Sequence, residues 1–78
     1  MKILVLGPGC SNCKKLEKVV HDALTRLNVK ADVEKVEDWA DIASFGVMST
    51  PGLVIDGTVV CSGRVPTVSQ VCEFVTAA

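Results

Sequence analysis

Two cysteines three positions apart, Cys10 and Cys13, lie in the stretch GPGCSNCKK at residues 7–15. This pair could exchange electrons as a dithiol and disulfide, supply two thiolates to a metal, or form an inert crosslink. A crosslink would stabilise little, because closing so short a ring removes only about 2 kcal/mol of unfolded-chain entropy. A zinc site needs four ligands, and the other cysteines, Cys61 and Cys72, are eleven positions apart. The spacing therefore favours redox exchange, with metal binding as the alternative.

The hydrophobic pattern places this pair between a strand and a helix. Residues 3–6 form a continuous apolar run that ends at the glycine, proline and glycine of residues 7–9, which is typical of a central strand covered on both faces. From Cys13 onward, apolar residues recur three and four positions apart, which predicts an amphipathic helix ending near Asn28. Cys10 then caps this helix, and Cys13 lies one turn further in on the same side.

The remaining sequence predicts a strand, a short helix, a hairpin and a last helix. Residues 29–34 alternate apolar and charged side chains like an edge strand, residues 38–45 resemble a short helix capped by Asp38, and residues 56–57 form the turn of a hairpin. A capping box at residues 67–70 opens the last helix. The order βαβαββα predicts an α/β fold, in which a four-stranded mixed sheet is flanked by three helices and the first and third helices share a face. We expect residues 1–78 to form one domain.

The start of the first helix suits thiol chemistry. Its unpaired backbone N–H groups and the positive end of its dipole favour a thiolate on Cys10. Side chains three apart on a helix have β-carbons about 5–6 Å apart, and a disulfide needs roughly 3.5–4.5 Å, so a slight tightening would close the ring. Cys10 is therefore the expected nucleophile toward a substrate disulfide and Cys13 the expected resolving thiol. This two-electron exchange needs no cofactor.

Three motifs in the chain point to a known family. They are GCSNC at residues 9–13 with Leu16 and Glu17 behind it, STPGLVIDG at residues 49–57, and GRV at residues 63–65. With them the whole chain resembles the thioredoxin superfamily, and more closely the small prokaryotic thioredoxin-like proteins named redox-active disulfide protein 2.

This resemblance implies a thioredoxin-like fold and the reduction of protein disulfides. It implies that Pro51 follows a cis peptide bond beside the dithiol and that Thr50 offers its backbone to an extended substrate, so that both residues bind substrate. It also implies re-reduction by a flavoprotein reductase or a thiol pool. Where thioredoxins carry a buried acid in the central strand, this chain has Leu4, so we expect deprotonation of Cys13 to depend on water or on Lys14.

Composition narrows the class of partner. The 78 residues carry a net charge of −1 and only three aromatic side chains, Trp39, Phe45 and Phe74, so we expect no nucleic-acid partner. The four apolar residues after Lys2 are too few for a signal segment or a membrane span. We expect a cytoplasmic monomer with its native N-terminus, no membrane partner, and protein disulfides as substrates.

Several other side chains are expected to be structural. Cys61 and Cys72 lie at core-facing positions where cysteine serves as a small hydrophobe, although a second disulfide or a relay to Cys10 is the alternative. His21 is expected on the exposed side of the first helix, too far from Cys10 to act as a base. Aromatic and methionine side chains are expected in the core or at its rim, namely those of Trp39, Phe45 and Met48.

Two functions besides the oxidoreductase stay open at this point. The same two cysteines could serve a thiolate metal-binding carrier or sensor whose partner supplies further ligands. The chain could also be an adaptor that keeps a peptide-binding groove near Pro51 but does not turn over.

Overall fold

The computed structural model describes residues 1–8 and 11–77. Cys10, the expected nucleophile, therefore lies outside the described residues. The elements follow the predicted βαβαββα order, and their bounds are β1 (Lys2–Leu6), α1 (Ser11–Leu27), β2 (Asp32–Val36), α2 (Trp39–Ser44), β3 (Gly52–Ile55), β4 (Thr58–Ser62) and α3 (Val68–Ala77). The fold is α/β, as expected.

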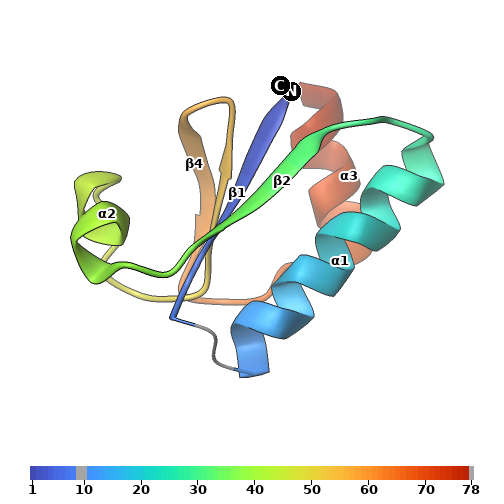
Figure 1. Ribbon diagram of the computed structural model, residues 1–78. Helices are drawn as coiled ribbons and strands as arrows, with labels where there is room; N and C mark the ends of the chain where they lie inside the picture. The colour runs from blue at the N-terminus through green and yellow to red at the C-terminus, as the bar shows by residue number, and fades with distance from the viewer. Residues whose placement is uncertain (9–10, 78) are drawn as a thin grey trace.

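The four strands form one mixed sheet in the order β2-β1-β3-β4. Strand β1 is interior, parallel to β2 and antiparallel to β3, and β3 pairs antiparallel with β4. Helices α1 and α3 lie side by side on one face of the sheet and α2 lies on the other (Figure 1). The predicted edge position of β2 and the shared face of α1 and α3 are confirmed.

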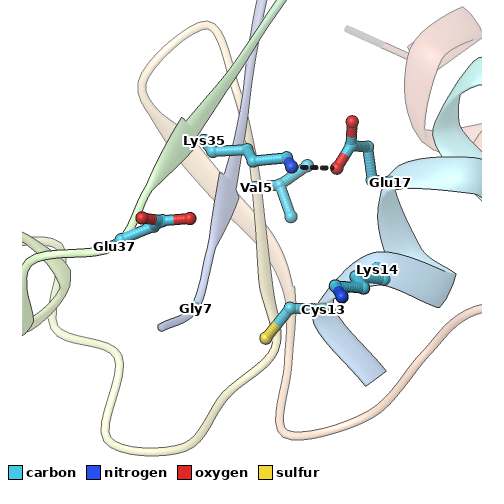
Figure 2. Close-up of a pocket in the computed structure, with 7 residues that line it drawn as sticks. All are labelled: Val5, Gly7, Cys13, Lys14, Glu17, Lys35 and Glu37. Carbon is cyan, nitrogen blue, oxygen red and sulfur yellow. Dashed lines mark ion pairs between the residues drawn. The ribbon is translucent and has the colours of Figure 1, made fainter. Parts of the chain in front are cut away.

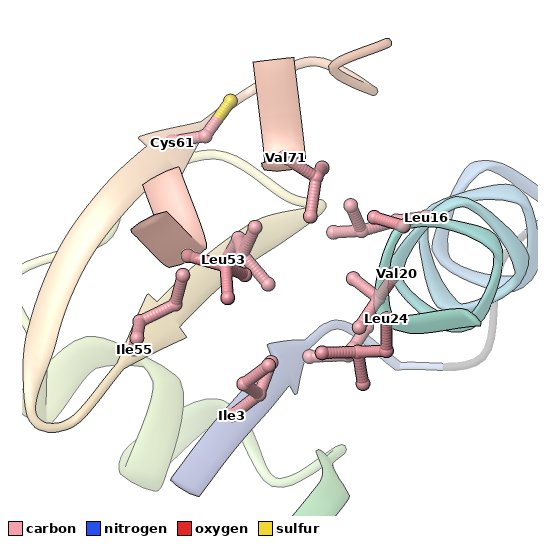
Figure 3. Close-up of a cluster of buried hydrophobic side chains, with 11 residues drawn as sticks. Ile3, Leu16, Val20, Leu24, Leu53, Ile55, Cys61 and Val71 are labelled. Carbon is pink, nitrogen blue, oxygen red and sulfur yellow. The ribbon is translucent and has the colours of Figure 1, made fainter. Parts of the chain in front are cut away.

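Successive side chains of β1 point to opposite faces of the sheet, and both faces are covered by helices, so β1 is apolar on both sides. Ile3 and Val5 face α1 and α3, whereas Leu6 faces α2 together with the partly buried Leu4. Figure 3 shows the larger cluster, in which strand side chains meet those of α1 and α3. Its buried members are Ile3, Val5, Leu16, Val20, Ala23, Leu24, Leu53, Ile55, Cys61, Val71 and Val75. The smaller cluster consists of Leu6, Ile42, Val47 and Val54.

Local side-chain chemistry sets the predicted turns and helix starts. Asp56 and Gly57 both have positive φ, 49° and 83°, as a two-residue hairpin turn of type I′ requires. The Asp38 carboxylate accepts the backbone N–H of Ala40 at 2.8 Å and so caps α2. At α3, the backbone N–H of residue 70 donates to Thr67 Oγ1 at 3.1 Å, and the backbone N–H of residue 67 donates to Gln70 Oε1 at 3.0 Å. This is the predicted capping box.

The second strand begins later than predicted. Helix α1 ends in a Schellman turn, in which Asn28 has a φ of 53° and the N–H of Val29 donates to the carbonyl of Leu24 at 3.0 Å. Residues 29–31 therefore connect α1 to β2, and only the later part of the alternating segment pairs with β1. The alternation of apolar and charged residues continued through the turn and hid its position.

Two side chains expected in the core or at its rim are on the surface. Met48 is 95% exposed and Trp39 is 54% exposed, whereas Phe45 is half-buried against the smaller cluster. Helix α2 buries a single residue, Ile42, so it has no room in the core for Trp39 at its start. Within residues 1–8 and 11–77, no helix has the length and hydrophobicity needed to cross a bilayer.

Candidate active site

The Cys13 side chain lies in the first turn of α1, packed beneath the end of β1. It is only 5% exposed. A β-carbon added to Gly7 would lie 2.1 Å from Cys13 Sγ, closer than real β-carbon contacts come, and 3.1 Å from Cys13 Cβ, which is a tight contact. The backbone at Gly7 is held there by its N–H, which donates to the Val36 carbonyl at 2.8 Å and extends the parallel pairing beyond β1. Gly7 is therefore required for space around the thiol.

The loop that contains Thr50 and Pro51, here called the proline loop, lies near Gly7 and Cys13. The peptide bond between Thr50 and Pro51 is cis, as the resemblance implied. Thr50 Cβ and Cys13 Sγ both lie within 4 Å of the point that a Gly7 β-carbon would occupy. Pro51 is buried, and its carbonyl accepts the N–H of Gly63 at 2.9 Å. Three sequence motifs that are far apart along the chain thus meet at one end of the sheet.

A cavity of about 70 Å³ opens beside Cys13, between α1 and the strands β1 and β2. Its lining residues are Val5, Gly7, Cys13, Lys14, Glu17, Lys35 and Glu37. Figure 2 shows Lys35 reaching from β2 toward Glu17 on α1, with Cys13 on the preceding turn of the helix and its sulfur toward the end of β1. Lys35 Nζ and Glu17 Oε2 are 2.9 Å apart. The hydrogen bond and charge of Glu17, with a smaller contribution from Glu37, raise the pKa of Lys35 above its ordinary value.

The cavity beside Cys13 contains carboxylates that the sequence did not reveal. Glu17 and Glu37 line the cavity of the Cys13 thiol, and Lys14, the expected alternative, lines it too. Two patterns in the sequence could have indicated the ion pair of Glu17 and Lys35. Glu17 follows Cys13 by four residues, which is about one helical turn. Lys35 follows Val33 by two residues, which places both side chains on the α1 face of β2. Lys35 does not stand out in the sequence because a charged residue on an edge strand usually faces solvent.

The remaining reactive side chains lie away from this cavity. Cys61 is buried and Cys72 is half-buried, both pack in the larger cluster, and neither forms a disulfide. Their thiols point to backbone carbonyls, those of Arg64 at 3.8 Å and Ala23 at 3.9 Å. Their expected core-facing positions are confirmed.

His21 is exposed as predicted, but it also approaches the cavity's ion pair. Its Nε2 lies 3.9 Å from Glu17 Oε1. Among residues 1–8 and 11–77, no three histidine, cysteine or carboxylate side chains come together in a way that could hold a metal ion.

A mixed sheet with helices on both faces, a CxxC sequence before and within the first turn of α1, and a cis Thr50–Pro51 bond whose threonine lies near the inner cysteine are typical of a thioredoxin-like disulfide oxidoreductase. Residues 1–76 match the model of the thioredoxin domain family, so the chain belongs to this family. A thioredoxin of Methanothermobacter thermautotrophicus is 37% identical over 71 residues, which cover 91% of this chain and 92% of that protein. A thioredoxin of Methanocaldococcus jannaschii is 34% identical over 71 residues, which cover 91% of this chain and 81% of that protein.

These matches establish the chain as a thiol-disulfide oxidoreductase of the thioredoxin family. They do not favour the alternative of a thiolate metal carrier.

Proposed function

We propose that this protein reduces protein disulfides through Cys10 as the nucleophile and Cys13 as the resolving thiol. The observation that carries the proposal is the meeting of the Cys13 sulfur and the Thr50 side chain around Gly7. It supports a site in which the inner thiol lies beside the loop that receives the substrate.

The exchange proceeds in two steps. Cys10 directly precedes Ser11, the first residue of α1, so the unpaired N–H groups and dipole of that helix favour its thiolate. The thiolate attacks a substrate disulfide, one substrate sulfur leaves with the electron pair, and a mixed disulfide forms on Cys10. Cys13 then attacks the Cys10 sulfur, forms the Cys10–Cys13 disulfide and releases the second substrate sulfur. Because Cys13 is buried, external disulfides reach it poorly, which favours attack by Cys10 first.

Thr50 and Pro51 are proposed to bind the substrate chain. Thr50 is half-buried next to the Cys13 thiol, and the buried Pro51 fixes the loop through its carbonyl. An extended substrate segment that pairs with the backbone of Thr50 would present its disulfide to Cys10, by the same main-chain pairing that adds a peptide strand to a sheet edge. We propose that a flavoprotein reductase or a thiol pool returns the electrons, and that the protein acts as a cytoplasmic monomer.

The test is to trap the intermediate. Cys13→Ser protein is incubated with a protein disulfide substrate and analysed by non-reducing electrophoresis and mass mapping. The proposal expects a mixed disulfide on Cys10 that accumulates with Cys13→Ser and is absent with Cys10→Ser. No adduct on Cys10 with either a protein or a small disulfide would overturn it. Stoichiometric zinc or copper in freshly purified, reduced protein would instead support the metal carrier.

A further inference from the structure

Arg64 lies beside the proline loop with its side chain exposed to solvent. It follows Gly63, whose N–H donates to the Pro51 carbonyl at 2.9 Å and so joins the chain after β4 to the proline loop. A β-carbon added to Gly63 would lie 3.3 Å from Ser49 Cβ, so the two segments are in close contact. Arg64 is therefore next to the loop that is proposed to receive the substrate.

The guanidinium of Arg64 is oriented by a neutral side chain. Its Nη1 donates to Gln70 Oε1 at 3.1 Å, and the same oxygen accepts the backbone N–H of Thr67 at 3.0 Å in the capping box of α3. An amide oxygen does not neutralise an arginine. Among residues 1–8 and 11–77, no carboxylate forms an ion pair with Arg64. The positive charge is therefore held in a fixed place and is available to a negatively charged ligand.

This arrangement does not serve the stability of α3. The start of a helix carries a partial positive charge, which repels a cation and attracts an anion. Residues 68–71, the first turn of α3, contain no acidic side chain. A capping box accepts glutamate as well as glutamine at its last position, and a glutamate there would both neutralise Arg64 and suit the helix end. Gln70 instead orients the guanidinium and leaves its charge unpaired.

An attraction for acidic substrates has to be local, because the whole chain has a net charge of −1. The exposed Glu37 and Asp38 follow β2 at one edge of the sheet, whereas Arg64 follows β4 at the opposite edge. The proline loop leads into β3, which pairs with β4. A substrate segment on this loop is therefore close to Arg64 on its β4 side.

We propose that Arg64 binds a carboxylate of the substrate, so that this oxidoreductase favours protein disulfides flanked by aspartate or glutamate. This inference rests on the proposed function of Cys10, Cys13 and the proline loop. A guanidinium has five N–H donors in a planar fork that matches a carboxylate, so Gln70 can hold one nitrogen while others bind the substrate. The contact forms no covalent bond; it holds the substrate segment on the proline loop while Cys10 attacks.

The experiment uses three short peptides with one cysteine each. They differ in having glutamate, glutamine or lysine at the two positions on either side of the cysteine, and each is used as its symmetric disulfide dimer. The reduced protein is mixed with each peptide at low ionic strength, samples are quenched with acid, and the released peptide thiol is measured by chromatography. The reaction of a Cys10→Ser, Cys13→Ser double variant is subtracted to remove Cys61 and Cys72.

Each rate is divided by the rate of the same peptide with dithiothreitol, which removes the effect of the peptide charges on the disulfide itself. The expected result is that the glutamate peptide reacts roughly 2–5-fold faster than the glutamine peptide, the effect of one exposed ion pair. The lysine peptide should react more slowly than the glutamine peptide. Both differences should shrink as salt is added, because salt screens exposed charges.

Charge variants assign the preference to one side chain. Arg64→Gln should lose the advantage of the glutamate peptide while its rate with the glutamine peptide stays unchanged, and Arg64→Glu should favour the lysine peptide. Arg26→Gln is the matched control, because it removes the same charge from an exposed arginine in the last turn of α1, at the opposite end of that helix from the site. It should keep the preference of the unmodified protein.

Gln70→Glu separates substrate binding from a structural role of Arg64. The new carboxylate keeps the capping box and pairs with the guanidinium, so the free energy of unfolding should not fall. The advantage of the glutamate peptide should nevertheless disappear, because the arginine charge is already neutralised. If Gln70→Glu keeps the full advantage, the proposed contact is wrong.

The remaining outcomes distinguish this proposal from the one on which it rests. Equal normalised rates for the glutamate and lysine peptides with the unmodified protein would overturn the role of Arg64 and leave the dithiol mechanism intact. The same preference in Arg64→Gln as in Arg26→Gln would overturn it too. If the reduced, unmodified protein releases no thiol from any of the three peptides, the proposed function itself fails.

Discussion

Gly7 and Cys13 are packed so closely that the position of a Gly7 β-carbon would be 2.1 Å from Cys13 Sγ. The glycine is at the end of the central strand and the cysteine is in the first turn of α1, so this contact sets how closely the strand end approaches the helix that carries the dithiol. The same point lies 3.9 Å from Thr50 Cβ. A change at Gly7 therefore reaches both the thiol and the proline loop.

Gly7→Ala is expected to destabilise the protein and to disturb the site. The new methyl group must displace the Cys13 side chain or the strand end, and overpacking of this kind typically costs about 1–3 kcal/mol of unfolding free energy. Urea denaturation of the reduced protein measures this change. Lys15→Ala, an exposed substitution on the same helix, should stay within about 0.5 kcal/mol of the unmodified protein. Equal stabilities for the two variants would contradict the contact.

Thr67→Ala is expected to weaken α3 without changing the redox site. It removes the hydroxyl that accepts the backbone N–H of residue 70 at 3.1 Å, and losing such a cap costs about 0.5–2 kcal/mol. Thermal or urea unfolding checks the stability, and the reaction with a small disulfide checks the site. Thr58→Ala, an exposed threonine in β4, serves as the control. An unchanged unfolding midpoint in Thr67→Ala would show that the capping box contributes nothing.

Met48→Ser is expected to leave the stability unchanged, because Met48 is 95% exposed. The change in unfolding free energy should stay within about 0.5 kcal/mol. Ile42→Ala, which removes the one buried side chain of α2, should cost about 2–5 kcal/mol. A loss in Met48→Ser that matches the loss in Ile42→Ala would contradict the exposed position of Met48.

Lys35 is expected to titrate above an ordinary lysine. The hydrogen bond and charge of Glu17 raise the pKa of Lys35 in the folded state, so this contribution to stability is fully present below the ordinary lysine value and is lost as the pH rises through the raised value. An NMR titration of the Lys35 side chain measures the pKa directly. In Glu17→Gln it should fall back toward the ordinary value, and an unchanged pKa in that variant would exclude the ion pair in solution.

The turns and helices that the sequence predicts correctly are those determined by residues close to one another along the chain. Asp56 and Gly57 supply the positive φ angles of a hairpin turn, Thr67 and Gln70 cap a helix within four residues, and the helical spacing after Cys13 marks the buried side of α1. None of these needs knowledge of the rest of the fold. The start of β2 was missed because the chain from Asn28 onward alternates in polarity through a turn that only its backbone conformation reveals.

The site was predictable only in part because its partners come from separate elements. The spacing of Cys10 and Cys13 and the loop at Thr50 and Pro51 are visible as motifs. The pairing of Glu17 with Lys35 depends on how α1 crosses the sheet, which no local pattern specifies. Likewise, the need for glycine at position 7 follows from a contact with the first helical turn.

The central claim, that Cys10 and Cys13 exchange two electrons as a pair, is tested most directly by equilibrating the protein with redox buffers of graded potential and mapping its thiols by mass spectrometry. The expected result is a single two-electron transition that links Cys10 to Cys13 and is absent from both Cys10→Ser and Cys13→Ser. If the two cysteines remain thiols across the whole range, or if the only transition involves Cys61 and Cys72, the claim is contradicted.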